Sequence, residues 1–377
     1  MAVPVLHVCD KFGVAGSSVH GVSRLFSWWF PRYDASRFDV SLCGLKRPEE
    51  ASRLLQEQGI PVHHLGRGRF DPRIVGDLVA LGRRLRARIL HVHGYAAADF
   101  GRIAARWLGA RLVLHEHFAD PSMPFYQGFA DRALAGYTDR AIAVSASTRD
   151  FLVGQRHVPE GRVRLIWNGA PLDEFAPVER PRALAVRREL GIADEAVVIG
   201  AVGRLSEQKG HRYLLDAAAA VLHGRPPVRV LLVGDGHLEV PLREQARALG
   251  IADRVVFAGH RTDIPAVLGA IDVLCISSLY EGTPLALFEA MASGKAIVST
   301  AVDGCREILQ DGATALLVPP VDAAGLAAGL GRVLDDPNLR ADLGPAARRA
   351  SASYDIRECV GKMEALYDEM LAEGDAC

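Results

Sequence analysis

Short apolar runs of strand length alternate with longer amphipathic segments along the whole chain of 377 residues. The apolar runs predict strands at 3–9, 38–43, 61–65, 89–93, 111–115, 140–144, 163–166, 197–202, 228–233, 254–258, 272–276, 296–300 and 315–318. Helical spacing of apolar residues predicts helices that include 74–88, 208–223, 238–249, 284–292 and 356–372. This alternation is typical of βαβ units, in which helices cover both faces of a parallel sheet.

A segment rich in proline and charge, 171–183, interrupts the pattern and predicts an interdomain linker. We therefore expect an α/β protein with two doubly wound, Rossmann-like domains, at 1–175 and 176–355, and a closing helical segment at 356–377. Ligands of such sheets bind beyond the carboxyl ends of the strands, so we expect a cleft between the two domains.

Composition narrows the choice of function. Apolar residues make up 49% and charged residues 24%, and the net charge is −1, which argues against a disordered chain and against a whole-protein nucleic-acid binder. The six cysteines form no CxxC pair, so a zinc cluster is not indicated and a reducing cytoplasm is expected. No uncharged apolar stretch reaches the ~18 residues of a membrane span.

Charge is divided unevenly between the halves. Residues 1–178 carry 23 basic and 17 acidic side chains, whereas 179–377 carry 21 and 28, which gives +6 and −7. The two halves are therefore expected to face different partners.

The segment 281–289 (EGTPLALFE) follows a predicted strand, with Thr283 as the expected N-cap and Pro284 as the first helical residue. Backbone N–H groups at such a helix start favour a phosphate. Glu281 and Glu289 are spaced to accept hydrogen bonds from separate hydroxyl groups of one elongated ligand. The alternative is a pair of solvated glutamates, and this spacing alone does not decide between them.

A second loop, 203–210 (GRLSEQKG), follows the strand at 197–202 and places Arg204 and Lys209 at another helix start, where two cations suit a diphosphate. The chain has only five lysines against 39 arginines, so a lysine in this loop is unusual for this sequence. A solvated basic loop is the competing interpretation.

Two further features lie near strand ends in the first half. The glycine-bearing turn 13–18 (GVAGSS) lacks the GxGxxG spacing of dinucleotide sites, and either forms a tight turn or lets Gly16 approach a phosphate. His91 and His93 end one predicted strand, and His115 and His117 end the next. We expect one or two of these histidines to donate hydrogen bonds in the cleft and the others to be structural, without a metal.

Several catalytic motifs are absent from the chain: GxxxxGK[ST], GxSxG, HExxH and an acidic D-x-D pair. A bound diphosphate would therefore be neutralised by arginine, lysine and helix N-termini rather than by a metal.

Taken in order, GRLSEQKG, LLVGDG, RVVFAGH, SLYEGTPLALFEAMASGKAIVST and DGATALLVPP resemble the nucleotide-sugar half of family-4 retaining glycosyltransferases of the GT-B fold. The first half is similar to the same family through HVHGYAAADFGRIAARWLGARLVLHEHF, AVSAST and VRLIWNGAPLDEFAP. The resemblance covers nearly all of 1–372 and implies that the last helix crosses back to the first domain.

The resemblance also implies roles for individual residues. Arg204 and Lys209 would hold the donor diphosphate beside Gly203, Glu281 would lie near the transferred sugar, and His117 near its C6 hydroxyl. The remaining donor-binding positions it implies are Gly16 and Ser17 at the phosphates, main chain near Arg261 at the base, Gly282, Thr283, Pro284 and Leu285 around sugar and phosphate, and Glu289 at the ribose. Ser17 departs from the second glycine of the family's loop.

The implied reaction is retaining transfer of a hexose from a nucleotide-diphosphate sugar, UDP before GDP, to a hydroxyl acceptor such as a glycolipid or polysaccharide precursor, with no other cofactor. Alternatives are a transferase for a small soluble metabolite and two enzymes that share the GT-B architecture, a sugar-nucleotide epimerase and a pyridoxal-phosphate phosphorylase. A two-domain oxidoreductase lacks its GxGxxG, and an exported solute-binding module lacks its signal.

Arginines gather in the first half at 67, 69, 73, 83, 84, 86 and 88, and Trp28, Trp29 and Phe30 end the first predicted helix beside Arg24 and Arg32. Two interpretations stay open. The arginines and aromatics could contact an anionic membrane or a lipid-phosphate acceptor, at the inner face of the membrane. Alternatively, the aromatics are core residues and the arginines keep the surface soluble.

Overall fold

The computed structural model describes residues 2–13, 21–120, 122–225 and 227–375, and the chain divides into two compact units. The described residues up to Asn168, together with 356–375, form the first unit, and 169–355 form the second. The chain changes unit earlier than the expected boundary at 175/176, because Gly169 and Ala170 lie beside the returning segment: the Ala170 N–H donates to Tyr354 O at 3.1 Å.

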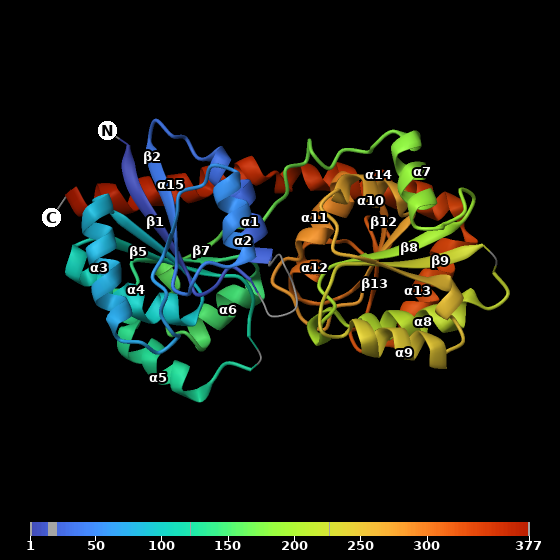
Figure 1. Ribbon diagram of the computed structural model, residues 1–377, viewed down its shortest axis with the longest axis horizontal. Helices are drawn as coiled ribbons and strands as arrows, with labels where there is room; N and C mark the ends of the chain where they lie inside the picture. Colours follow the sequence, from blue (N-terminus) through green and yellow to red (C-terminus); the bar gives the residue numbers. More distant parts are fainter. Residues whose placement is uncertain (1, 14–20, 121, 226, 376–377) are drawn as a thin grey trace. The chain divides into compact units, whose positions relative to one another are not determined.

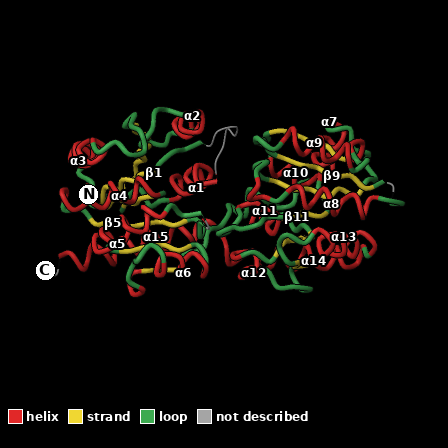
Figure 2. Tube along the Cα trace, turned by 90° about the horizontal axis from the view of Figure 1, so that it is seen from below, coloured by secondary structure: helices red, strands yellow, loops and turns green. Residues whose placement is uncertain are grey.

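The first unit is built on a parallel sheet with the strand order β3-β2-β1-β4-β5-β6-β7. Its strands are β1 (Val3–Cys9), β2 (Phe38–Gly44), β3 (Val62–His64), β4 (Ile89–His93), β5 (Arg111–Glu116), β6 (Arg140–Ala143) and β7 (Val163–Leu165). Its helices, labelled in Figure 1, are α1 (Gly21–Trp29), α2 (Glu50–Glu57), α3 (Arg73–Leu85), α4 (Tyr95–Leu108), α5 (Phe125–Leu134), α6 (Ala146–Gly154) and α15 (Ile356–Asp375). Helices lie on both sides of the strands (Figure 2).

The two faces of this sheet differ in chemistry because side chains alternate along each strand. One face is aliphatic and packs against α3 and α4 through residues that include Leu6, Val8, Leu90, Val92 and Leu112. The other face carries histidines beneath α1 and α15. Trp28, Trp29 and Phe30 are buried there, so a lipid contact through these three aromatics is wrong and the core interpretation is confirmed.

Helix α15 comes from the far end of the chain and belongs to the first unit. Met363, Tyr367 and Met370 are buried, and acidic residues on the helix pair with arginines of the sheet and its loops. Arg164 Nη2 lies 2.7 Å from Glu369, and the backbone N–H of Asp34 donates to Glu364 at 2.7 Å. Apolar burial and ion pairs thus both hold α15 against the sheet.

The second unit is a parallel sheet with the order β10-β9-β8-β11-β12-β13. Its strands are β8 (Val197–Val202), β9 (Val228–Val233), β10 (Val255–Gly259), β11 (Val273–Ile276), β12 (Ala296–Thr300) and β13 (Leu316–Val318). Its helices are α7 (Arg180–Glu189), α8 (His211–Leu222), α9 (Glu239–Ala248), α10 (Ile264–Ala270), α11 (Leu285–Ala292), α12 (Asp303–Ile308), α13 (Ala323–Asp335) and α14 (Pro337–Ser351).

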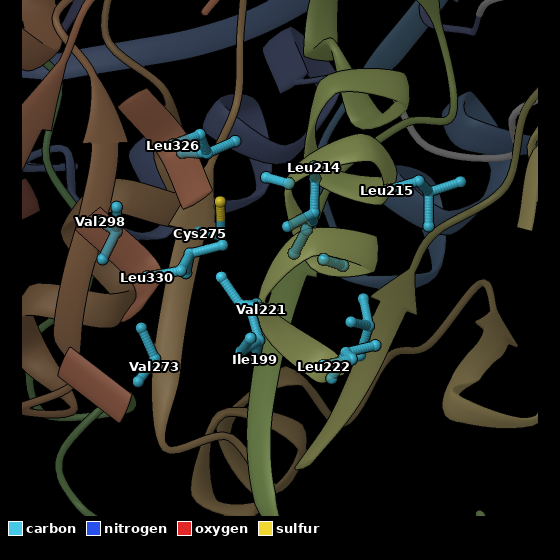
Figure 3. Packing of buried hydrophobic residues seen from close by; sticks show 14 of the residues in the cluster. Ile199, Leu214, Leu215, Val221, Leu222, Val273, Cys275, Val298, Leu326 and Leu330 are labelled. Atoms are coloured by element: carbon cyan, nitrogen blue, oxygen red, sulfur yellow. The ribbon is translucent and has the colours of Figure 1, made fainter. Parts of the chain in front are cut away.

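Figure 3 shows the core on one face of this sheet, where Leu214 and Leu330 point from helices α8 and α13 toward the strands. The strands β8, β11 and β12 contribute Ile199, Val273 and Val298 to the same core. The side chains are fully buried, and each contributes roughly 1.5–3 kcal/mol through removal from water. This packing holds β8 and β11 rigidly side by side, with their carboxyl ends at one edge.

Every strand expected from the apolar runs is present, with ends that shift by a residue or two, and the expected α/β architecture is confirmed. Helix α7 begins inside the segment expected as a linker, because Pro181 lies in its first turn, where no backbone donor is needed. Among the described residues, no helix is both long and apolar enough to cross a bilayer.

A buried ionic cluster joins α4, α5 and the segment that follows α6 in the first unit. Asp131 on α5 accepts from Arg102 at 2.5 Å and from Arg156 at 2.6 Å, and all three side chains are fully buried. Arg156 also pairs with Glu116 at the end of β5. Because charges out of water need partners, this cluster fixes the inward face of α5.

We expect Asp131→Asn to lower the free energy of unfolding of the first unit by about 3–5 kcal/mol, because two buried arginines lose a shared counter-charge. All four tryptophans lie at or before position 167, so tryptophan fluorescence in urea follows this unit. Asp150→Asn, an exposed change on α6, is the control and should shift the value by no more than about 0.5 kcal/mol. Equal unfolding midpoints for the two variants would contradict the assigned role.

Candidate functional site

Strand order reverses between β8 and β11 in the second unit, and open α/β sheets bind ligands at such a point. The loop after β8 spans 203–210 and leads into α8, and the loop after β11 spans 277–284 and leads into α11. These are the two loops that carry most of the site residues expected from the sequence.

The two loops are bonded to each other along their main chains. The Leu279 N–H donates to Gln208 O at 2.8 Å, and the Gln208 side-chain amide donates to Tyr280 O at 3.1 Å. Gly210 has a φ of +60°, and a Cβ there would lie 2.1 Å from Ser277 O. Only glycine therefore permits this approach, which brings the start of α8 against the β11 loop.

Lys209 and Glu281, which the sequence placed in separate motifs, form an ion pair across these loops. Lys209 Nζ lies 2.5 Å from Glu281 Oε1, and the same oxygen accepts from Ser278 Oγ at 2.8 Å. The Lys209 side chain is 21% exposed and that of Glu281 is 7% exposed. The pair is thus largely shielded from water, where charge interactions are stronger than on the open surface.

Arg204 comes one residue after Gly203 in the first loop and is half-buried. Its Nη2 lies 3.4 Å from Gln208 Oε1, and its buried Nε has no hydrogen-bond partner among the described residues. A guanidinium in this state retains donors for an anion.

The start of α11 differs by one residue from the expectation. The helix begins at Leu285, and Pro284, not Thr283, occupies the N-cap position, because its ψ of 127° lies outside the helical region while its carbonyl accepts from Leu287 N–H at 3.0 Å. Gly282 packs under α12: a Cβ on Gly304 would lie 1.8 Å from Gly282 O. The 282–285 segment is therefore held in place before a helix N-terminus, which favours an anionic group.

Glu289 lies on α11 and its side chain is fully buried, and Glu281 is also buried. The interpretation of these two residues as solvated glutamates is therefore wrong. Buried carboxylates beside a helix N-terminus remain candidates for hydroxyl recognition.

Arg261 follows β10 at the edge of the sheet. Its guanidinium donates to Asp263 at 2.8 Å and pairs with Glu189, and these two carboxylates raise the pKa of Arg261 further. The side chain is committed to these contacts, so a role at a nucleotide base would fall to the main chain, as expected.

His117 lies in the first unit. It follows β5, and its Nε2 lies 3.0 Å from His93 Nδ1. Gly16 and Ser17 lie outside the described residues. Three residues that were not expected from the sequence, His7, Tyr33 and Tyr367, join the same histidines. The alternation of His7 with apolar neighbours in β1 was the available signal.

The arrangement in the second unit has a definite chemistry. Two cations and two helix starts at one sheet edge favour a diphosphate, and two buried carboxylates nearby favour hydroxyl groups. A nucleotide-diphosphate sugar contains both kinds of group.

Comparison with known proteins agrees with this chemistry. Residues 184–350 match the family model described as glycosyl transferases group 1, and residues 24–174 match glycosyltransferase family 4. An Escherichia coli relative, the UDP-Gal:alpha-D-GlcNAc-diphosphoundecaprenol alpha-1,3-galactosyltransferase, is 27% identical over 80% of each chain. D-inositol 3-phosphate glycosyltransferase of Salinispora tropica is 29% identical over 76% of this chain and 64% of its own.

Among solved structures, Anabaena HepE in complex with UDP aligns with a TM-score of 0.83 at 23% identity, over 98% of this chain and 100% of its own. The fold shared with such structures is GT-B. The chain therefore belongs to family 4 of the glycosyltransferases, which have the GT-B fold and use nucleotide-sugar donors.

Proposed function

We propose that the protein is a retaining hexosyltransferase that moves a sugar from a UDP-sugar to a hydroxyl group of a glycolipid or polysaccharide precursor. The observation that carries the proposal is the Lys209–Glu281 ion pair at the strand-order reversal, which links the diphosphate motif to the sugar motif. The names of the E. coli relative, with its UDP-galactose donor and lipid-diphosphate acceptor, support both the base and the acceptor class.

Breaking the anomeric C–O bond leaves negative charge on the departing diphosphate. Arg204, Lys209 and the starts of α8 and α11 stabilise that charge, which lowers the barrier for departure. Lys209 has three donors and uses one on Glu281, so the ion pair orients the ammonium while leaving donors for phosphate oxygens.

The carboxylates have separate roles in this proposal. Glu289, buried on α11, accepts hydrogen bonds from the vicinal hydroxyls of the ribose, and Glu281 lies beside the transferred sugar. Glu281 is held by Lys209 and Ser278, which makes it a poor nucleophile. The acceptor hydroxyl therefore attacks from the side of the leaving group, with a phosphate oxygen as base, and the anomeric configuration is retained.

A transferase for a small soluble acceptor is the second candidate. The D-inositol 3-phosphate glycosyltransferases among the relatives support it, since the compound in their name is a small phosphorylated polyol. The donor side of the site is the same in both cases, so the distinction rests on the acceptor and on membrane contact.

Helix α5 supports membrane contact because its polarity is inverted. Its buried side chains are Gln127 and Asp131, whereas Phe125 is 83% exposed and Phe129 is 74% exposed. An outward aromatic face on a helix with a polar inner face indicates apolar surroundings outside the protein.

The exposed aromatics extend beyond the helix. Phe70 is exposed and its ring lies 5.9 Å from that of Tyr126, so Phe70, Phe125, Tyr126 and Phe129 form a continuous group, named here the α5 aromatic patch. Arg69 lies over the Phe70 ring, and Arg132 is exposed on α5. At the end of α3, Arg83, Arg84 and Arg86 are also exposed. Aromatics beside arginines suit the interface of an anionic bilayer.

Donor chemistry predicts that UDP raises the melting temperature of the protein more than GDP or ADP, because binding to the folded state stabilises by mass action.

Lys209→Ala and Arg204→Ala should each lower turnover at least about tenfold, since a charged contact contributes ~1.5–3 kcal/mol. Arg247→Ala, an exposed change on α9, is the control. Near-normal turnover of either site variant would remove that residue from the diphosphate site.

The stereochemical prediction is that the product has the same anomeric configuration as the donor, with turnover unchanged in EDTA because the neutralising groups are side chains and helix termini. Product anomers are read by NMR of the transferred sugar. An inverted product would contradict retention, and loss of activity in EDTA would contradict neutralisation by Arg204 and Lys209.

The membrane prediction concerns vesicles that contain phosphatidylglycerol. Binding should appear at low salt, fade at high salt and weaken at least about tenfold in Phe125→Ser/Phe129→Ser, because each lost aromatic contact removes ~1.5 kcal/mol or more. Replacing Arg83, Arg84 and Arg86 by Glu should abolish the low-salt gain. Val240→Ser, an exposed apolar change in the second unit, is the control. No binding of the native protein at low salt would favour the soluble acceptor.

A further inference from the structure

Five histidines lie on one face of the first unit's sheet. His7 pairs in register with His91, and His93 pairs with His115, so these four side chains share the face beneath α1. They are at most 2% exposed, whereas His117, just after β5, is half-buried. His117 is therefore the member of the set that reaches the end of the sheet where ligands bind.

Three of the rings form a hydrogen-bonded row, named here row 1. His7 Nδ1 lies 3.1 Å from His93 Nε2, and His93 Nδ1 lies 3.0 Å from His117 Nε2. The planes of these successive rings differ by 10° and 23°. Both N···N distances lie within the range of N–H···N hydrogen bonds.

The other two rings form row 2, which stacks on row 1. His91 Nε2 lies 3.0 Å from His115 Nδ1, and His91 Nδ1 lies 2.6 Å from the Tyr367 hydroxyl on α15. Centroids of His7 and His91 are 4.4 Å apart, and those of His115 and His117 are 4.5 Å apart. Trp29 from α1 stacks on His115 at 5.2 Å.

Two tyrosine hydroxyls close both rows at the end away from His117. The Tyr33 hydroxyl lies 3.3 Å from His7 Nε2 and 3.2 Å from the Tyr367 hydroxyl. Tyr33 also reaches Met363 Sδ at 3.7 Å. The Tyr367 hydroxyl, which is bonded to His91 Nδ1, also lies 3.4 Å from His7 Nε2. Tyr33 is the nearer of these two hydroxyls to His7 Nε2, and a donation from it leaves the His7 proton on Nδ1.

The buried rings are neutral. The direction of each hydrogen bond in row 1 therefore determines the direction of the next one. Burial lowers the pKa of His7 to about 3, and burial and neighbouring histidines hold the pKa values of His91 and His93 well below the usual range. A neutral imidazole has one donor and one acceptor. When Tyr33 donates to His7 Nε2, His7 and His93 must both donate from Nδ1.

Each of the histidines that could hold a metal ion is already hydrogen-bonded to another histidine through a ring nitrogen. His93, His115 and His117, or His7, His91 and His93, could gather around an ion. However, row 1 already uses both ring nitrogens of His93 in bonds to His7 and His117. A metal would have to break these bonds, so hydrogen bonding is the state that the geometry supports.

We propose that Tyr33 and row 1 set which ring nitrogen of His117 carries its proton, with Tyr33, His7 and His93 as positioning residues for His117. The link to catalysis rests on the proposed function, because the resemblance to family-4 glycosyltransferases implies that His117 lies near the C6 hydroxyl of the transferred sugar. A single tautomer presents one defined hydrogen bond to a sugar hydroxyl, as second-sphere partners do for other functional histidines.

The test measures ring ¹⁵N shifts of His117 in protein labelled with ¹⁵N-histidine, with His117→Gln to assign the signal. Tyr33→Phe keeps the aromatic ring and removes the hydroxyl, and it should move His117 from one tautomer to the other or to a mixture. Tyr137→Phe, which removes an exposed hydroxyl in the same unit, is the control and should leave the shifts unchanged.

A double-mutant cycle separates this transmission from a structural effect. His93→Asn keeps a polar atom near His117 Nε2 but cuts row 1 from His7. In that background Tyr33→Phe should no longer change the His117 signal, whereas a structural effect of Tyr33 would persist. Unchanged His117 shifts in Tyr33→Phe, or a stoichiometric metal ion bound by tag-free protein at these histidines, overturns the proposal.

Kinetics then connect the row to the reaction. Tyr33→Phe should lower kcat/KM for the donor about tenfold at an unchanged unfolding midpoint, and the cycle with His93→Asn should show the same coupling. If the tautomer responds while kcat/KM does not, row 1 stands and the placement of His117 at the sugar is wrong. If His117→Gln is inactive while Tyr33→Phe leaves the tautomer unchanged, the proposed site stands and row 1 does not set it.

Discussion

The reversal of strand order between β8 and β11 is the constraint on which the proposed donor site depends. Because the chain leaves these neighbouring strands toward opposite sides of the sheet, their loops are not covered by a crossover helix and can meet each other. Gly210 allows the meeting, and Lys209 and Glu281 complete it with opposite charges. The loops are positioned by strands that are themselves fixed in the core, so the site has little freedom to rearrange.

The first unit meets a different constraint on its own sheet. One face is aliphatic, but the other carries buried histidines, and buried polar groups are costly unless they are hydrogen-bonded. The histidines bond to one another, and Tyr367 supplies a partner from the far end of the chain. Helix α15 is therefore held by polar bonds as well as by apolar burial, and such satisfied networks favour one arrangement over others.

The strands and the donor loops could be predicted because their signals are local. Apolar runs mark each strand, and Lys209 and Glu281 stand in loops whose position follows from strand–helix alternation. The histidine rows could not be predicted, because His7, Tyr33 and Tyr367 meet only through strand register and the docking of α15. The inverted face of α5 was hidden for a similar reason: Asp131 lies on the buried side of α5 because it forms ion pairs there with Arg102 and Arg156, which come from other segments of the chain.

The choice of lysine at position 209 follows from the chemistry of its ammonium group. In a chain with 39 arginines, this position carries a lysine, and its side chain lies in the space next to Gly203. The lysine brings a compact ammonium to Glu281, whereas the planar guanidinium of arginine directs its donors in a fixed fork. Arg204, in the same loop, carries such a fork, which suits the paired oxygens of the diphosphate in the proposed function. The two cations thus differ in their contacts. The ammonium of Lys209 is fixed by a carboxylate, whereas the Nε of Arg204 has no hydrogen-bond partner among the described residues.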